Sequence, residues 1–118
     1  MVTPVSIENR LVTLSKQVDE VHNDLLEAES HYFSMKAQYE IALAKSRLHF
    51  ASISSPTGKN YTIGEREDLA LIENQTLHLE ISAAEALVKG TRANAARIRT
   101  QVDIARSIGT SVRASLDL

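Results

Sequence analysis

The sequence predicts an all-α protein, a long antiparallel helical hairpin with coiled-coil heptads that assembles as a homo-oligomer. Three observations indicate this fold. Apolar residues recur at alternating spacings of four and three, which is typical of a coiled-coil seam. Helix breakers gather in one cluster at 52–60, and a helix-capping pattern follows at 62–65. We expect residues 1–118 to form a single helical domain.

Composition narrows the class of protein. The 118 residues include no Cys, which excludes a disulfide framework, a Cys-ligated metal and a cysteine nucleophile, and suits a reducing compartment. No targeting segment is visible, and no stretch approaches the roughly 20 apolar residues of a membrane span. The net charge of −2 is unevenly spread: 1–88 holds 7 basic and 13 acidic residues, whereas 89–118 holds 6 and 2.

The first helix is predicted from about residue 6 to about residue 50. Ser6 can cap its start, and Pro4 lies just outside, where it breaks no helical hydrogen bond. A loop at about 52–61 follows, because Ser, Pro, Gly and Asn cluster there. The predicted seam of this helix comprises Ile7, Leu11, Leu14, Val18, Val21, Leu25, Ala28, Tyr32, Met35, Tyr39 and Ala42.

The second helix is predicted over about 62–108. Thr62 and Glu65 fit a capping box at its start. Its apolar stripe shifts near Gly90, so we expect a continuous helix with room for a bend there, and an end around Gly109. The first half of the stripe comprises Leu69, Ile72, Thr76, Leu79, Ala83 and Ala86. The second half comprises Leu87, Thr91, Asn94, Ile98, Val102, Ala105, Ile108 and Val112.

Two long helices cannot bury their apolar faces alone, because an antiparallel pair leaves much of each face in water. This predicts that the hairpin needs further copies of itself. The alternative is a hairpin that breaks at Gly90 and folds back into a compact bundle.

Catalytic and metal sites are not predicted. No Walker, GxGxxG or GxSxG pattern occurs. Glu27 and His31 are spaced to share a metal, but no second pair completes a site. We therefore expect neither an enzyme nor a bound cofactor.

The basic C-terminal third carries a periodic pattern. Arg92, Arg99, Arg106 and Arg113 recur every seven residues, and Lys89 extends the line by one turn. On a continuous helix they form one line of guanidinium groups, which match phosphates through paired N–H donors. This predicts binding to an extended polyanion. The alternative is pairing with acidic residues of a neighbouring hairpin, for example Asp19, Glu20, Asp24 and Glu27.

A second basic group closes the first helix. Lys45 and Arg47 are two residues apart and diverge on the helix surface. Phe50, Tyr39 and Tyr61 lie nearby in sequence, and aromatic side chains beside cations can stack on unpaired bases.

The segment Lys45-Ser46-Arg47-Leu48, followed by His49 and Phe50, resembles the K-A-R-L-then-aromatic segment of the UvsY recombination-mediator proteins of T-even phages. A Gly-containing loop, an acidic helix start at 65–68 and a long final helix follow in both, so the resemblance covers roughly residues 25–113. Ala51 and His49 depart from the family pattern, and 7–21 does not align with it.

The resemblance implies an all-helical protein that forms ring-like homo-oligomers. It also implies binding to single-stranded DNA, with Lys45 and Arg47 at the positions of the family's basic pair. The partners implied are a RecA-class recombinase and a single-strand-binding protein, in the cytoplasm of a phage-infected bacterial host.

The favoured prediction is a non-enzymatic, single-stranded DNA-binding recombination mediator that helps load a RecA-class recombinase. Its predicted contacts are Lys45, Arg47, Lys89, Arg92, Arg99, Arg106 and Arg113. The alternatives are a helical structural or adaptor protein, such as a phage virion or assembly component, and a helical regulator of another protein.

Overall fold

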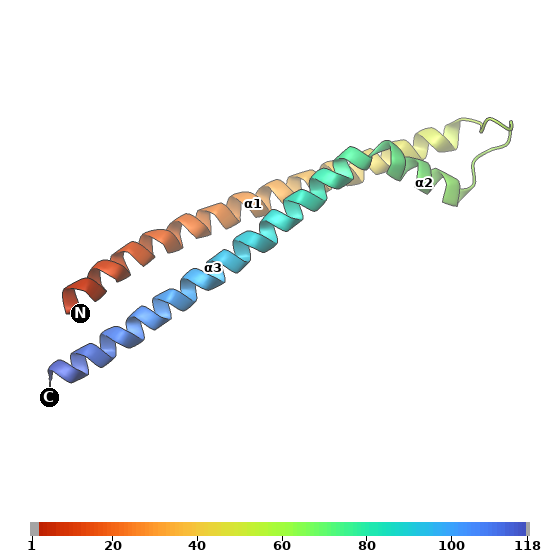
Figure 1. Ribbon diagram of the computed structural model, residues 1–118. Coiled ribbons are helices and arrows are strands. Elements are labelled where there is room, and N and C mark those ends of the chain that lie inside the picture. Colours follow the sequence, from red (N-terminus) through yellow and green to blue (C-terminus); the bar gives the residue numbers. More distant parts are fainter. Residues whose placement is uncertain (1–2, 118) are drawn as a thin grey trace. The chain divides into compact units, whose positions relative to one another are not determined.

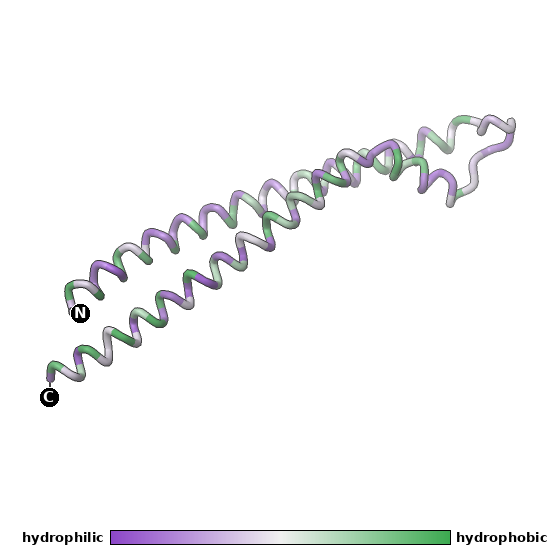
Figure 2. Tube along the Cα trace, viewed as in Figure 1, coloured by the Kyte–Doolittle hydropathy of each residue, from purple (hydrophilic) through white to green (hydrophobic). Residues whose placement is uncertain are grey.

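The protein is an all-α helical hairpin, as the sequence predicts. The structure, a computed structural model, describes residues 3–117. It contains α1 (Pro4–Ser52), α2 (Ile63–Glu73) and α3 (Gln75–Leu116) (Figure 1). Within the described residues no strand forms, and one isolated bridge joins Ser54 to Asn60 in the loop between α1 and α2. Apolar residues recur along the whole length of α1 and α3 (Figure 2).

The chain divides into two compact units. Unit 1 comprises Met1–Ala28 and Val88–Leu118, and unit 2 comprises Glu29–Leu87. Each unit is therefore a helix pair: α1 and α3 each contribute one half to each unit, and α2 belongs to unit 2.

The start of α1 differs from the sequence prediction. Pro4 is the first helical residue, and Thr3 takes the capping position assigned to Ser6. The Thr3 hydroxyl accepts the Ser6 N–H at 3.1 Å, and the Ser6 hydroxyl accepts the Thr3 N–H at 2.9 Å. Proline is well suited to the first helical position, because the N–H that it lacks would have no intrahelical partner there.

The predicted seam of α1 is confirmed. Every seam position from Ile7 to Ala42 is buried or half-buried. Leu14 is fully buried in unit 1, and the packed face extends in unit 2 to Leu43, Ser46 and Phe50. The periodicity of α1 therefore identifies the face that packs.

The loop and the start of α2 also follow the sequence. Gly58 has φ 82°, a left-handed conformation that glycine adopts without strain. Thr62 and Glu65 form the predicted capping box: each backbone N–H donates to the other residue's side chain, both at 3.1 Å. Tyr61 packs edge-on against Phe50, with ring centroids 5.9 Å apart, so the loop is held against the end of α1.

The second helical segment differs from the prediction in where it is interrupted and where it ends. The helix is interrupted at Asn74, which the sequence does not predict, whereas α3 is continuous through Gly90 as predicted and extends past Gly109 to Leu116. A glycine inside a helix costs only about 1 kcal/mol, which packing can offset. At Asn74 the side chain competes with backbone N–H groups for a carbonyl acceptor, since the Asn74 amide donates to the Ala70 carbonyl at 2.8 Å.

The packed face of α2 and α3 is only partly the one predicted. The stripe predicted for the first half is largely exposed: Ile72 is 65 % and Leu79 67 % exposed. Much of the second half is correct, although Leu87 and Ile108 are exposed. The packed residues keep one heptad register throughout: Ala70, Asn74, Leu77, Ile81, Ala84, Val88, Thr91, Ala95, Ile98, Val102, Ala105, Gly109 and Val112.

A buried polar contact joins the helices of unit 2. The Asn74 amide donates to the Ser46 hydroxyl at 2.9 Å, and Ser46 is only 8 % exposed. Because a buried polar group without a partner is costly, this contact favours the one register in which both groups are satisfied.

Replacing Asn74 by Asp tests this contact. The substitution keeps the side-chain shape but removes both amide donors and places a carboxylate against the Ala70 carbonyl. We expect the free energy of unfolding, measured by urea denaturation at fixed protein concentration, to fall by about 1–3 kcal/mol. The matched control is Gln75→Glu, the same chemical change at an exposed neighbour. Equal stability of N74D and the wild type would contradict this account.

Two helical glycines in unit 1 should respond differently to alanine. At Gly90 an added Cβ meets no atom within 4 Å, so Gly90→Ala should stabilise the protein by about 0.5–1 kcal/mol. At buried Gly109 the Cβ would lie 3.2 Å from Cγ2 of Ile7, so the gain should shrink or disappear. Thermal unfolding of both variants measures the difference, and equal gains would show that Ile7 yields freely.

Candidate nucleic-acid interface

The line of arginines lies along one edge of the packed face of α3. Each arginine directly follows a packed residue, namely Thr91, Ile98, Ala105 or Val112, so the seven-residue spacing of the seam sets the spacing of the line. The side chains of Arg92, Arg99, Arg106 and Arg113 are all exposed, as is that of Lys89. The helix therefore presents the predicted line as one continuous edge.

Three of these arginines are available to a ligand. Within the part of the chain that the structure describes, Arg99, Arg106 and Arg113 make no ion pair with a carboxylate. Lys89 and Arg92 have interaction partners within the protein. The charge most open to an external anion is therefore that of Arg99, Arg106 and Arg113.

Arg99 also contributes to packing. It lines a cavity of about 170 Å³ that includes Val21, Leu25 and Ile98. A long cationic side chain can cover apolar residues with its methylene groups while its charged end stays in water. Arg99 therefore borders the seam of unit 1 while the side chain as a whole stays exposed.

The edge of α1 in unit 1 that corresponds to the arginine line carries little negative charge. Glu8, Ser15 and His22 follow the packed residues Ile7, Leu14 and Val21 at the same seven-residue spacing, and Glu8 is the one acid of the three. Exposed Asp19 follows the half-buried seam residue Val18, and His22 lines the same cavity as Arg99. The four acidic residues considered as alternative partners are all exposed: Asp19, Glu20, Asp24 and Glu27.

Two further arginines of unit 1 lie off the line. Arg97 donates from Nη2 to Oδ1 of Asn94 at 2.8 Å, one turn away on α3. Arg10 donates from Nη2 to Oε1 of Gln101 at 3.4 Å, which joins α1 to α3. Arg10 is not among the contacts predicted from the sequence, because it lies in the acidic part of the chain. Its position directly before the seam residue Leu11 could have indicated a contact with the other helix, because a residue beside the seam lies at the edge of the packed face.

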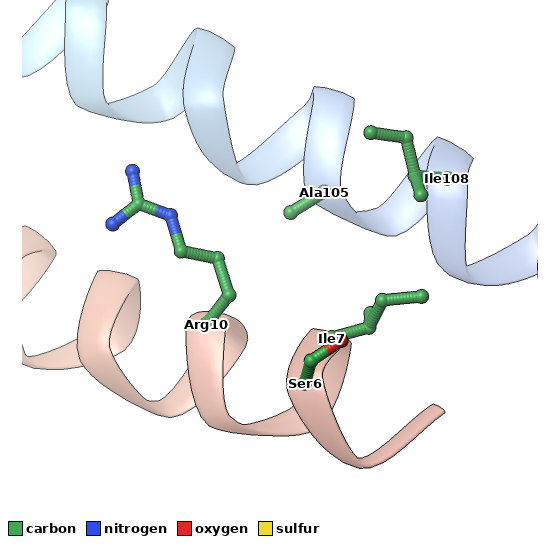
Figure 3. A pocket seen from close by; sticks show the side chains of 5 residues that line it. All are labelled: Ser6, Ile7, Arg10, Ala105 and Ile108. Carbon is green, nitrogen blue, oxygen red and sulfur yellow. The ribbon is translucent and has the colours of Figure 1, made fainter. Parts of the chain in front are cut away.

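Arg10 borders a small apolar hollow at the ends of α1 and α3 in unit 1 (Figure 3). Ser6, Ile7 and Arg10 line it from α1, and Ala105 and Ile108 from α3; its volume is about 200 Å³. Ile7 and Ala105 belong to the packed core. The hollow is thus a shallow extension of the seam with a single cation beside it.

Lys45 and Arg47 lie in unit 2 and are exposed. They flank buried Ser46 and diverge on α1, as the sequence predicts. The arginine line belongs to unit 1. The structure therefore places the predicted contacts in two groups, one in each unit.

The aromatic residues near Lys45 are partly engaged in packing. His49 and Phe50 have ring centroids 5.2 Å apart, and Phe50 in turn contacts Tyr61. Tyr39 packs beside His78 instead, at 5.7 Å. His49 is the exposed ring of this group, whereas Phe50 and Tyr61 are half-buried.

The described residues hold no group of three or more His, Cys, Asp or Glu side chains that could bind a metal ion. None of the helices combines the length and apolar character needed to cross a membrane, within residues 3–117.

The chain matches no known protein-family model. No curated protein matches it, and no solved structure does. The resemblance to UvsY proteins therefore rests on residues 45–50 and the helical setting around them.

Proposed function

We propose that this protein is a single-stranded DNA-binding recombination mediator that helps load a RecA-class recombinase. One observation carries the proposal: Arg99, Arg106 and Arg113 are exposed along one edge of α3 without ion pairs in the described part of the chain. Guanidinium groups bind phosphate oxygens through paired N–H donors. The phosphates of a nucleic-acid backbone would therefore supply the negative charge that pairs with these arginines.

The spacing suits an extended strand. Seven residues of helix correspond to about 10 Å, so the line offers cations at regular intervals along an edge. Contacts of this kind read phosphates and carry no base information, so binding should be tolerant of sequence. Lys89 and Arg92 extend the line, and Lys45 and Arg47 in unit 2 form a second group of contacts.

The proposed assembly of several copies would strengthen this binding. One protomer offers few phosphate contacts, whereas linked copies make each further contact intramolecular and raise the overall affinity. The role in loading a recombinase, the single-strand-binding protein partner and the phage-infected bacterial host rest on the resemblance of residues 45–50 to the UvsY segment.

A second candidate function is that of a helical structural or adaptor protein. It is favoured by the apolar residues that lie exposed in unit 2, since such surfaces commonly bind other proteins. In that function the arginines would form ion pairs with a neighbouring chain instead of with phosphates. DNA binding separates the two functions.

Binding of a labelled oligonucleotide tests the proposal. Fluorescence anisotropy should show preference for the single strand over the duplex, with affinity that falls as salt rises, because phosphate contacts release counterions. Replacing Arg99, Arg106 and Arg113 together by Gln should weaken binding and reduce the slope of log K against log salt by about 0.7 for each lost contact. Arg97→Gln, which lies off the line, is the matched control. No binding at low salt would refute the proposal and favour the adaptor function.

A second variant tests the contacts in unit 2. Replacing Lys45 and Arg47 together by Gln should lower the affinity for single-stranded DNA. Sedimentation velocity should find the assembly unchanged, since exposed ion pairs contribute only about 0–1 kcal/mol each. If the assembly dissociates instead, these two residues are structural and their assignment as DNA contacts is wrong.

A further inference from the structure

Unit 2 carries an uncharged stripe on the outer face of α1. Its members are spaced by three or four residues and lie opposite the packed face on the helix. Phe33, Ile41 and Leu48 are 59 %, 58 % and 72 % exposed. With the exposed small residues Ala37 and Ala44 between them, they form what we call the α1 stripe.

A second uncharged stripe lies on the outer face of α2 and the first turns of α3. It repeats the spacing of three and four without interruption, and Ile72 and Leu79 are its most exposed large residues. We call it the α2–α3 stripe. It comprises Leu69, Ile72, Thr76, Leu79, Ala83 and Ala86.

The spacing indicates what kind of partner these stripes take. The α2–α3 stripe alternates three and four, and the α1 stripe is spaced four, four, three and four. Spacings of three and four present apolar residues to another helix, whereas a loop or a small ligand imposes no such period. Each helix of unit 2 thus has two seams on opposite sides. The inner seam is filled by the hairpin itself, and the outer seam is not covered by any described part of this chain.

The two stripes complement each other in side-chain volume. Inside unit 2, α1 and α3 are antiparallel, with Tyr39 beside His78 and Ser46 bonded to Asn74. The alignment of Tyr39 with His78, applied to the stripes of two copies, places a large residue against a smaller one at four successive levels, and at the fifth level it places Leu48 against Leu69. The facing pairs are Ala44 with Ile72, Ile41 with Thr76, Ala37 with Leu79, and Phe33 with Ala83.

The charges beside the stripes are complementary as well. Lys45 and Arg47 flank the α1 stripe on its two sides, near Leu48. Glu73 and Asp68 flank the α2–α3 stripe at the corresponding level. All four side chains are exposed, so they would form a polar rim that orients the contact and adds little to its strength.

We propose that the α1 stripe of one copy packs against the α2–α3 stripe of the next copy. The contact is heterologous, because it joins two different faces. Each copy then keeps one stripe available for a further copy, so the assembly grows beyond a dimer and ends only when it closes on itself. This inference specifies the interface between copies. Because Lys45 and Arg47 lie at its rim, their pairing with a neighbouring copy would compete with the DNA contacts proposed for these two residues. The DNA contacts proposed for Arg99, Arg106 and Arg113 in unit 1 are independent of it.

Cysteine cross-linking tests the pairing directly, since the chain has no cysteine of its own. The double variant Ile41→Cys/Thr76→Cys carries one thiol on each stripe, and the two thiols of one chain lie on opposite outer faces of unit 2. Mild oxidation should produce a ladder of cross-linked chains longer than a dimer on a denaturing gel. Each single variant, Ile41→Cys or Thr76→Cys, should remain uncrosslinked.

The matched control is Gln38→Cys/Gln75→Cys, whose positions are exposed on the same helices but lie off the stripes. It should give no ladder, although it assembles like the wild type in sedimentation velocity. A dimer formed by either single variant would show that like stripes pair with each other and would overturn the proposal. A monomeric wild type, or an assembly without the 41–76 ladder, would overturn it too and leave the stripes to a different protein.

Discussion

A helix that packs against a single neighbour buries only one of its faces. This constraint determines which apolar and charged residues of the hairpin are exposed. In each unit the seam residues of α1 and α3 are covered by one another, and nothing in the described residues covers the opposite faces. A narrow seam with many small residues, such as Ala84, Ala105 and Gly109, buries little apolar area for its length. This is the physical reason why the sequence predicts that the hairpin needs further copies of itself.

Much of the fold could be predicted because it depends on local periodicity. The heptads of α1, the loop near Gly58 and the capping box of Thr62 and Glu65 each follow from residues a few positions apart. The face of α2 that packs could not be predicted in this way, because the segment carries two apolar stripes of similar quality. Which of them faces α1 is decided by tertiary contacts such as that of Asn74 with Ser46, which no local pattern reveals.

The candidate site, like the fold, could be predicted only in its local and periodic features. The arginine line is periodic, so its place on one edge of α3 was visible in the sequence. Its relation to the seam was not, because that depends on which residues pack. Tyr39 shows the same limit: it is close to Lys45 in sequence, yet it packs beside His78 and leaves His49, Phe50 and Tyr61 as the aromatic group near the loop.

The contacts of the hairpin also differ in how much chain they enclose, and this bears on the order in which the protein folds. The Ser46–Asn74 bond closes a segment of 28 residues, whereas the Arg10–Gln101 bond closes one of 91. Chain entropy disfavours long closures formed first, and short-range contacts form faster. If folding starts at the loop and proceeds toward the termini, each new contact closes only the short unpaired segment that lies beyond the contacts already formed. The buried polar pair near the loop would then set the alignment before the more uniform alanine-rich seam could pair one heptad out of step.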